Sequence, residues 1–324
     1  MRKSVVAAAL AMCLGWAGQA AAQNFPNRPI TLVIPFAAGG PTDVLGRAMA
    51  QRVGEILGQT IVVENVGGAG GMLGSSRVAQ AAPDGYTILL GTVGTHAQNQ
   101  SLYKKPLYHA ANDFTPVVLM AELPLILLAT KDLPANDMKA FVIYAKENQG
   151  KMQYGSAGAG SATHLGCVLV NEVLGTKITH VPYPGTGPAM TDLIAGRVDF
   201  LCDIITTAKP QVDGGTVKAI ATLSKTRSPA LANTPTSVEQ GTNIEAYTWN
   251  AFFLPKGAPA DVVKKLNQAT VEAMKAPTVR SRLEGLGAVF VSEDRTTPEY
   301  LGKFVLSEIE KWAKPIKAAG VTVD

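Results

Sequence analysis

The sequence predicts an α/β protein of two domains with a ligand cleft between them. Three times, a short apolar run leads through a glycine-rich turn into a segment with helical spacing of apolar residues, over residues 30–57, 60–82 and 151–174. Apolar runs of this length, rich in β-branched residues, are typical of strands buried on both faces. Because strands alternate with helices, we expect a parallel sheet. The 324 residues, 47% of them hydrophobic, are enough to form two cores.

The N-terminal segment, residues 1–22, has the pattern of a secretory signal peptide. Arg2 and Lys3 precede an apolar run that is too short to span a bilayer, and residues 20–22 form an A-x-A cleavage site. No other run of the sequence is long and apolar enough to be transmembrane. We therefore expect a soluble protein, exported to the periplasm, whose mature chain begins at Gln23.

The charge of the chain argues against nucleic acid as a partner. The formal net charge is +4, and loss of Arg2 and Lys3 with the signal leaves 29 − 2 = 27 basic residues against 25 acidic ones. These basic residues are scattered and form no basic patch. The sequence also lacks an H-E-x-x-H motif and any metal-ligand spacing of its histidines. We therefore expect no nucleic acid, no metal and no cofactor.

The first predicted strand ends in a turn of small residues, 37–43. Gly39 and Gly40 leave their backbone N–H groups uncovered. Thr42 and Asp43 stand where a helix N-cap belongs. Uncovered N–H groups at a helix N-terminus form a site for a carboxylate or a phosphate. The alternative is an ordinary turn between strand and helix, with Asp43 as its cap.

A second turn of this kind, residues 155–161, follows the strand-like run 151–154. It reads Gly-Ser-Ala-Gly-Ala-Gly-Ser, and helical spacing resumes from Leu165. Two such turns could hold the two ends of one anionic molecule. Neither contains Arg or Lys, so backbone dipoles and hydroxyl groups would have to replace the usual arginine contact.

A third glycine-rich turn, residues 65–71, follows the second predicted strand. It fails the dinucleotide-binding pattern G-x-G-x-x-G because Leu73 occupies the last glycine position. It is therefore either a wall of the same cleft or a close-packing turn. The third strand, 86–90, leads into an exit loop at 91–96. In parallel sheets, ligands bind beyond the carboxyl ends of the strands, so we expect these loops to meet at one edge.

The remaining elements suggest that one domain is inserted into the other. The tail contains too few strands to form a domain, so we expect it to pack on the first sheet. The domains would then comprise residues 23–122 with 251–324, and residues 123–250, joined by a two-crossing hinge. We expect strands at 114–120, 123–129, 152–154, 178–183, 198–203, 217–221 and 288–291, an apolar run at 249–254, helices at 136–148, 189–195, 260–275, 277–286 and 298–319, and irregular structure at 227–241.

Two cysteines remain after loss of the signal. Cys167 lies on the helix after the second turn, and Cys202 lies near the end of a predicted strand. In an oxidising compartment an even pair permits a disulfide. The alternative is two buried thiols that act as small apolar side chains. The sequence leaves both open.

Taken together, short motifs along almost the whole mature chain resemble one family. The matching stretches include Asp43, the pair 64–65 and His164, and the segments FPNRPI (25–30), PFAAGG (35–40), GGAGG (67–71), PDGYT (83–87), GTHA (94–97), DFTPV (113–117), GSAGAGS (155–161), VPY (181–183), DLIAG (192–196), VDF (198–200) and LPKGAP (254–259). The chain resembles the Bug-type, TctC-like extracytoplasmic solute receptors of tripartite tricarboxylate transporters.

This resemblance implies a two-domain, type II-like periplasmic binding fold with a two-crossing hinge. It implies a small carboxylate ligand, with di-, tri- and aromatic dicarboxylates as candidates, and membrane transporter subunits as partners of a monomeric receptor. Asp203 is expected to meet an amino or hydroxyl group of the ligand. The expected ligand-binding residues are Phe36, Ala37, Gly39, Gly40, Thr42, Asp43, Gly68, Thr92, Ser156, Ala157, Gly158, Gly160, Ser161, His164 and Asp203.

Two other functions remain open at this point. An exported hydrolase would use Ser156 or Ser161 with His164, although the G-x-S-x-G pattern is absent. His164 could equally be a core residue. A sensor subunit would present the ligand to a signalling partner. The preferred interpretation is a receptor that captures its ligand and is no enzyme, and the sequence does not name the acid.

Overall fold

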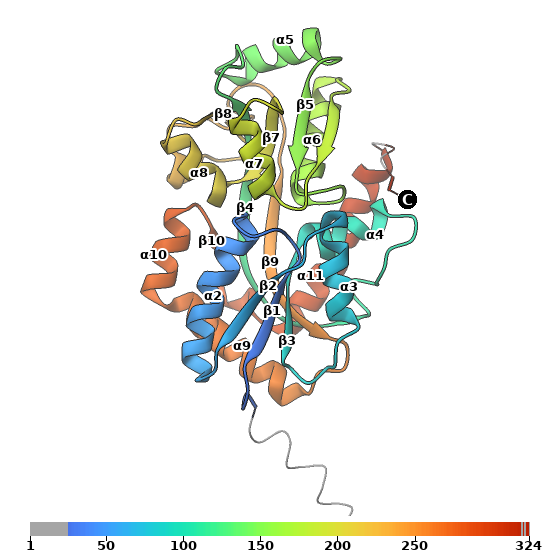
Figure 1. Ribbon diagram of the computed structural model, residues 1–324, viewed down its shortest axis with the longest axis vertical. Helices are drawn as coiled ribbons and strands as arrows, with labels where there is room; N and C mark the ends of the chain where they lie inside the picture. Colours follow the sequence, from blue (N-terminus) through green and yellow to red (C-terminus); the bar gives the residue numbers. More distant parts are fainter. Residues whose placement is uncertain (1–24, 319, 321, 324) are drawn as a thin grey trace, which may run out of the picture.

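The computed structural model describes residues 25–318, 320, 322 and 323. The predicted signal segment, 1–22, lies outside the described residues. Figure 1 shows an elongated α/β molecule with a lower and an upper half. Strand β4 (Phe114–Thr130) passes from the lower half into the upper one, and β9 (Tyr247–Pro255) lies beside it.

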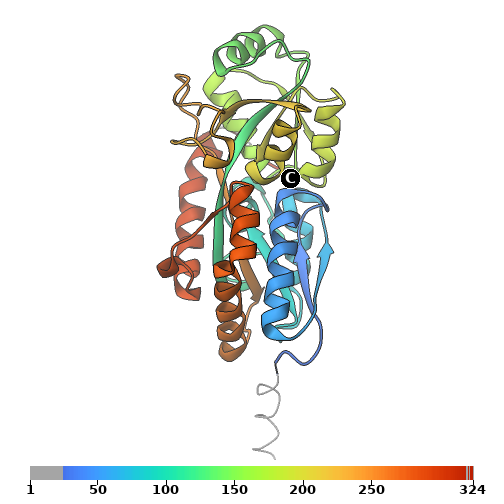
Figure 2. The same cartoon turned by 90° about the vertical axis from the view of Figure 1, so that its left-hand side faces the viewer.

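The lower half is built from both ends of the described chain. The C-terminal helices α9 and α11 pack on β4, on the flanks seen in Figure 2. In chain order, the elements are β1 (Ile30–Ile34), α2 (Pro41–Leu57), β2 (Ile61–Asn65), η1 (Ala69–Gly71), α3 (Met72–Ala79), β3 (Thr87–Thr92), η2 (Gly94–Gln98), α4 (Asn99–Leu102), α9 (Ala260–Lys275), α10 (Pro277–Gly285), β10 (Val289–Phe290), η4 (Glu293–Arg295) and α11 (Pro298–Ala318).

The upper half is formed by the middle of the chain. One apolar cluster, around α7 and α8, lies within this half, whereas the cluster on the other face of its strands continues into the lower half. Its elements are α5 (Met138–Asn148), β5 (Gln153–Ser156), α6 (Ala162–Leu174), β6 (Thr179–Pro182), α7 (Thr186–Ile194), β7 (Phe200–Ile204), α8 (Ile205–Asp213), β8 (Val217–Thr222) and η3 (Pro229–Leu231).

The sheet is mixed, and the prediction of a parallel sheet is therefore only partly correct. Its strand order is β2-β1-β3-β9-β4-β7-β5-β6, with β8 and β10 also paired to β4. The outer groups β2-β1-β3 and β7-β5-β6 are parallel. At the centre, β9 is antiparallel to β3 and β4, and β4 is antiparallel to β7. The chain crosses between the halves once in each direction, which requires antiparallel neighbours there.

The two runs predicted at 114–120 and 123–129 form one continuous strand, β4. Its first part, up to Pro124, pairs with β9. From Leu125 onward it pairs with β7, and from Ile126 with β8. The change of partners falls within residues 122–126, where the sequence predicts one of the two crossings of the hinge. The domain boundaries themselves remain a prediction.

The start of α2 differs from the expected cap. The helix begins at Pro41, whose missing N–H is no loss at this position. Gly40 is the N-cap, and no side chain caps the helix there. Thr42 and Asp43 lie inside the first turn, so their prediction as the cap is wrong. By contrast, Ser161 does cap α6, because its Oγ accepts a hydrogen bond from the backbone N–H of His164.

Both cysteines of the described chain are buried free thiols. The backbone N–H of Cys202 donates to Sγ of Cys167 at 3.1 Å, which ties β7 to α6. This arrangement matches the alternative of two buried thiols. Among the described helices, none is long and apolar enough to cross a bilayer.

Candidate functional site

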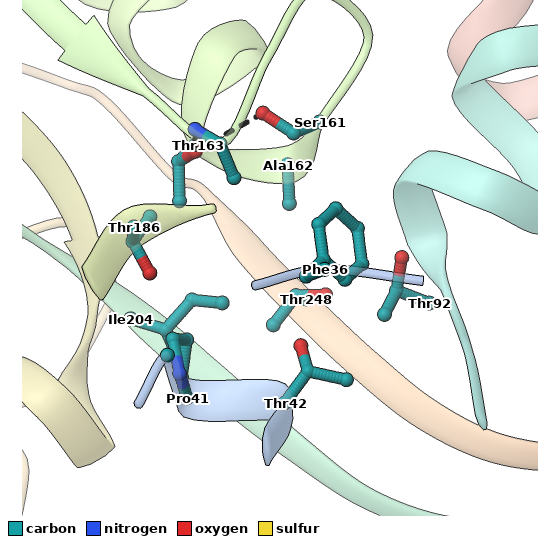
Figure 3. A pocket seen from close by; sticks show the side chains of 12 residues that line it. Phe36, Pro41, Thr42, Thr92, Ser161, Ala162, Thr163, Thr186, Ile204 and Thr248 are labelled. Atoms are coloured by element: carbon teal, nitrogen blue, oxygen red, sulfur yellow. Dashed lines mark hydrogen bonds between the residues drawn. The ribbon is translucent and has the colours of Figure 1, made fainter. Parts of the chain in front are cut away.

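A pocket lies where the two halves meet. Its empty space, counted out to the open mouth and including solvent there, is about 330 Å³. The side chains surround it from both halves (Figure 3). It is lined by Phe36, Gly40, Pro41, Thr42, Thr92, Ala157, Ser161, Ala162, Thr163, Thr186, Ile204 and Thr248.

Four helices begin at this pocket. The lining residues Gly40, Ser161 and Ile204 are the N-caps of α2, α6 and α8, and Thr186 is the first residue of α7. Each helix presents the positive end of its dipole at its N-terminus. The convergence follows from the topology, because the loops after β1, β5, β6 and β7 lie on the sides of the halves that face each other.

Among the described residues, no charged side chain lines the pocket, neither a basic one nor the expected Asp43 and Asp203. Six of its lining residues carry hydroxyl groups instead. In addition, first-turn N–H groups have no acceptor within their own helix. Those of Thr42, Asp43, Ala162 and Thr163 find no other acceptor in the described part of the chain. The site therefore offers neutral donors and helix dipoles to an anion.

Asp43 fixes the shape of the first turn and does not line the pocket. Its carboxylate accepts from the N–H of Gly39 at 3.0 Å, from Nε of Arg47 at 2.9 Å and from Nδ2 of Asn65 at 2.9 Å. Asn65 also donates to the carbonyl oxygen of Phe36 at 3.0 Å. Burial acts to raise the pKa of Asp43, but the hydrogen bonds from Arg47, Gly39 and Asn65 outweigh it and lower that pKa. The turn is thus held by an ionised carboxylate.

The second turn uses its own amides internally, contrary to expectation. The N–H of Gly158 donates to Oγ of Ser156 at 3.1 Å, and the N–H of Gly160 donates to Nδ1 of His164 at 3.2 Å. The N–H of Ala157 donates to Oγ1 of Thr163 at 2.9 Å. Side chains of the same segment therefore consume the donors that the sequence assigned to a ligand. The free donors lie one turn later, at the start of α6.

His164 is packed among rings. It stacks on His180 with ring centroids 4.2 Å apart, and the ring centroid of Tyr154 lies 5.0 Å from that of His180 and 6.4 Å from that of His164. Burial, and then the neighbouring His180, lower the pKa of His164 to about 3. The ring is therefore neutral and holds the second turn through Gly160.

The serines are not arranged as a nucleophile with His164. Ser161 Oγ donates to the carbonyl of Gly158 at 2.7 Å and accepts from the main-chain N–H of His164. Ser156 does form a 2.6 Å hydrogen bond with a histidine, Nε2 of His180. Ser156 is, however, fully buried and does not line the pocket.

Several contacts join the halves around the pocket. The N–H of Ala37 donates to the carbonyl of Pro184 at 3.1 Å, and the hydroxyl of Tyr103 donates to the carbonyl of Ala159 at 2.9 Å. A Cβ placed on Gly70 would lie 2.1 Å from the oxygen of Ala159, so the backbones nearly touch there. The structure therefore represents a closed arrangement.

The predicted meeting of three loops at one edge is confirmed. A Cβ on Gly71 would lie 2.6 Å from Cγ2 of Thr95 and 3.0 Å from Cζ of Phe36. Gly68 has φ +126 and its carbonyl accepts from the N–H of Gly71, so it shapes the third loop and does not line the pocket.

Asp203 lies behind the pocket wall. It is fully buried, and its Oδ2 accepts from Oγ1 of Thr207 at 2.6 Å. Burial raises the pKa of Asp203 to about 7, while the hydrogen bond from Thr207, the Ile204 backbone and the nearby hydroxyl of Thr186 act to lower it. Its neighbour Ile204, and not Asp203 itself, lines the pocket.

The structure thus sorts the fifteen expected residues into two groups. Phe36, Gly40, Thr42, Thr92, Ala157 and Ser161 line the pocket, and Ala37, Gly39, Asp43, Gly68, Ser156, Gly158, Gly160, His164 and Asp203 do not. Six lining residues were missed. Pro41, Ala162, Thr163 and Ile204 adjoin expected residues, and Thr186 lies between the predicted strand 178–183 and the predicted helix 189–195. Nothing in the local sequence marks Thr248.

Comparison with known proteins decides the family. The profile of the tripartite tricarboxylate transporter family receptor, TctC, matches residues 45–321. The chain belongs to this receptor family. The resemblance found in the sequence is thereby confirmed.

Solved structures of similar proteins confirm the fold class. The periplasmic binding protein BugD is 40% identical, with a TM-score of 0.89 over 92% of this chain and 99% of its own. MatC from Rhodopseudomonas palustris with bound malate is also 40% identical, with a TM-score of 0.88 over 90% of this chain and 100% of its own. A further R. palustris protein with adipate is 34% identical, with a TM-score of 0.87 over 92% and 99%. The receptor described here has their α/β architecture.

Proposed function

We propose that this receptor binds a small carboxylate in the pocket between its halves, in the periplasm, and delivers it to the membrane subunits of a tripartite tricarboxylate transporter. The observation that carries the proposal is the convergence of four helix N-termini on a pocket without a charged side chain. A carboxylate near a helix N-terminus gains about 0.3–1 kcal/mol from each helix dipole, and more when it is partly buried. The bound acids of MatC and of the adipate-bound neighbour support the ligand class.

The proposal includes closure of two domains on the ligand. We take residues 23–122 with 251–324 as one domain and residues 123–250 as the other, joined where β4 changes partners. Contacts such as Tyr103 to Ala159 would then form only when the domains close. Because these contacts surround the pocket, ligand binding and closure favour each other. The membrane subunits would recognise the closed monomer.

We propose that the receptor captures its ligand without converting it. Ser161 has no free histidine ring as a base, and Ser156 with His180 is shielded from the pocket. A role as a sensor subunit would use the same pocket and differ only in the partner. Pull-down of the membrane partner would distinguish it from transport.

The ligand class is tested by calorimetry on protein that has been unfolded, stripped of bound solute and refolded. The panel is malate, succinate, adipate, citrate, tricarballylate and phthalate. We expect saturable one-to-one binding of at least one acid. The matched control is the diamide of the acid that binds, which keeps the shape but loses both charges. Absence of heat for every acid, or equal binding of acid and diamide, would refute the proposal.

A further inference from the structure

Two polar atoms beside the pocket are buried without a partner in the described part of the chain. They are Oγ1 of Thr186 and Oδ1 of Asp203, and the two residues are 3% and 0% exposed. Buried polar groups are nearly always hydrogen-bonded in folded proteins. Unpaired atoms at this place indicate that a group outside the chain completes them.

The two atoms lie at different depths. Thr186 lines the pocket, and its hydroxyl oxygen points toward the other lining residues (Figure 3). A Cβ placed on Gly40 would lie 3.4 Å from that oxygen, so the hydroxyl stands where the halves meet. Asp203 lies behind it. The Thr186 hydroxyl is close enough to favour the ionised form of this carboxyl group, although it forms no hydrogen bond of standard geometry with it.

This arrangement sets the direction in which Thr186 can bond. An ionised carboxylate only accepts hydrogen bonds, whereas a hydroxyl has one proton and two acceptor lone pairs. The free oxygen of Asp203 therefore attracts the single proton of Thr186. The lone pairs of Thr186 then face the pocket. Thr186 presents an acceptor there, at a site whose helix N-termini present donors.

We infer that Thr186 and Asp203 form an acceptor subsite, which selects a carboxylate that carries a hydroxyl group over the same acid without it. The inference rests on the proposed function and narrows its ligand class. A ligand hydroxyl would donate to Thr186, and Thr186 would donate to Asp203, so that both unpaired atoms are satisfied. An ammonium group is a poorer fit, because a cation is disfavoured beside four helix N-termini.

The test uses matched pairs of acids that differ in one hydroxyl group, malate with succinate and citrate with tricarballylate. Calorimetry is carried out at pH 8, where Asp203 is ionised, on the native protein and on the variants Asp203→Asn, Thr186→Val and Thr186→Ser. Thr191→Val, on the same helix but exposed, controls for substitution of a threonine.

We expect the native protein to prefer the hydroxylated acid by about tenfold, which corresponds to one hydrogen bond. Thr186→Val removes the acceptor and should abolish the preference. Asp203→Asn should do the same, because an amide can donate to Thr186 and turn its proton toward the pocket. Thr186→Ser keeps the hydroxyl and should keep the preference, and Thr191→Val should leave the ratio unchanged.

Failure of the acceptor subsite can be distinguished from failure of the proposed receptor function. If an acid binds but the native protein shows no preference for the hydroxylated partner, the subsite does not exist, although the receptor function stands. The same follows if both Thr186→Val and Asp203→Asn keep the preference, because a buried water then completes the two atoms. If no acid of any pair binds, the proposed function fails together with the inference. Thermal unfolding of each variant shows whether it is folded, and either of the two informative variants suffices.

Discussion

At the scale of single residues, Gly40 allows the charge of the ligand to be tested without disturbing the fold. It is the N-cap of α2, with φ −82 and ψ 172, and a Cβ there would meet no atom closer than 3.4 Å. Asp and Asn are both favourable N-caps, so either should fit and keep the helix stable. They differ only in charge.

We predict that Gly40→Asp lowers carboxylate affinity by about 100-fold, whereas Gly40→Asn lowers it by about fivefold or less. A like charge about 5 Å away costs about 3 kcal/mol at an effective dielectric constant of about 20. The measurement is calorimetric titration of both variants, with thermal unfolding as the control for folding. Equal losses in the two variants would mean that no anion binds beside Gly40. Gly160 would not serve, because a Cβ there would lie 2.1 Å from Oδ1 of Asn99.

The individual residues also show what the sequence could reveal about the site. Phe36, Gly40 and Thr42 were predictable, because a turn between a strand and a helix exposes its residues by local geometry alone. The amides of Gly158 and Gly160 were misjudged because their acceptors depend on side-chain placement that local sequence does not fix. Asp43 was expected to bind the ligand, but its carboxylate accepts from Gly39 and does not line the pocket.

At the scale of elements, the contact between the segment after α4 and the turn before α6 joins the two halves of the molecule. The hydroxyl of Tyr103 donates to the carbonyl of Ala159 in the other half. The hydroxyl of Tyr86, by contrast, bonds Asn27 within the same half. The two tyrosines thus form a matched pair: the hydroxyl of one bonds across the two halves, and the hydroxyl of the other bonds within one half.

We predict that Tyr103→Phe weakens ligand binding by about 3- to 10-fold, because a hydrogen bond contributes about 0.5–1.5 kcal/mol and this one is present only after closure. Tyr86→Phe should leave affinity unchanged and lower only the stability of the protein. Affinity is measured by calorimetry and stability by urea unfolding. If both variants bind the ligand as well as the native protein does, the contact of Tyr103 contributes nothing to closure.

The elements were predicted best where their apolar residues recur at a single regular spacing along the sequence. The strands β1 to β3 and the helices α2, α9 and α11 followed from apolar periodicity. Two examples show where this signal failed. Residues 114–129 were divided into two runs because Glu122 interrupts the apolar pattern, yet Arg295 pairs with Glu122 and lets the strand continue. Helix α8 was missed because Pro210, which usually breaks a helix, lies inside it.

At the scale of the whole molecule, four titratable groups couple the fold to pH: the buried His96, His164 and Asp203, and the half-buried His180. Burial lowers the pKa of His96 to about 3 and that of His180 to about 4, and burial and a neighbouring ring lower that of His164 to about 3. Burial raises the pKa of Asp203 to about 7. The three histidines and the aspartate act in opposite directions.

Whether stability rises or falls with pH depends on which state, folded or unfolded, binds more protons. Below the ordinary histidine value of 6.5, the unfolded chain binds up to three protons on the histidines that the folded protein refuses, so stability falls as pH decreases. Below about pH 7 the folded protein binds one proton on Asp203 that the unfolded chain binds only near 3.8, so this group adds stability as pH decreases. Between pH 6 and 5 the unfolded chain therefore binds almost two protons more than the folded protein does.

We therefore predict that the unfolding free energy falls by up to about 2.7 kcal/mol per pH unit over this range in the native protein, and by up to about 4 kcal/mol in Asp203→Asn. The variant loses the opposing group, so its decline is steeper. At pH 8 it should be the more stable protein, since it no longer buries an ionised carboxylate. Urea unfolding of both proteins at pH 8, 6 and 5 measures these differences. Parallel curves for the two would show that Asp203 does not change its ionisation on folding, and that the acceptor at the pocket wall is not a buried carboxylate with a raised pKa.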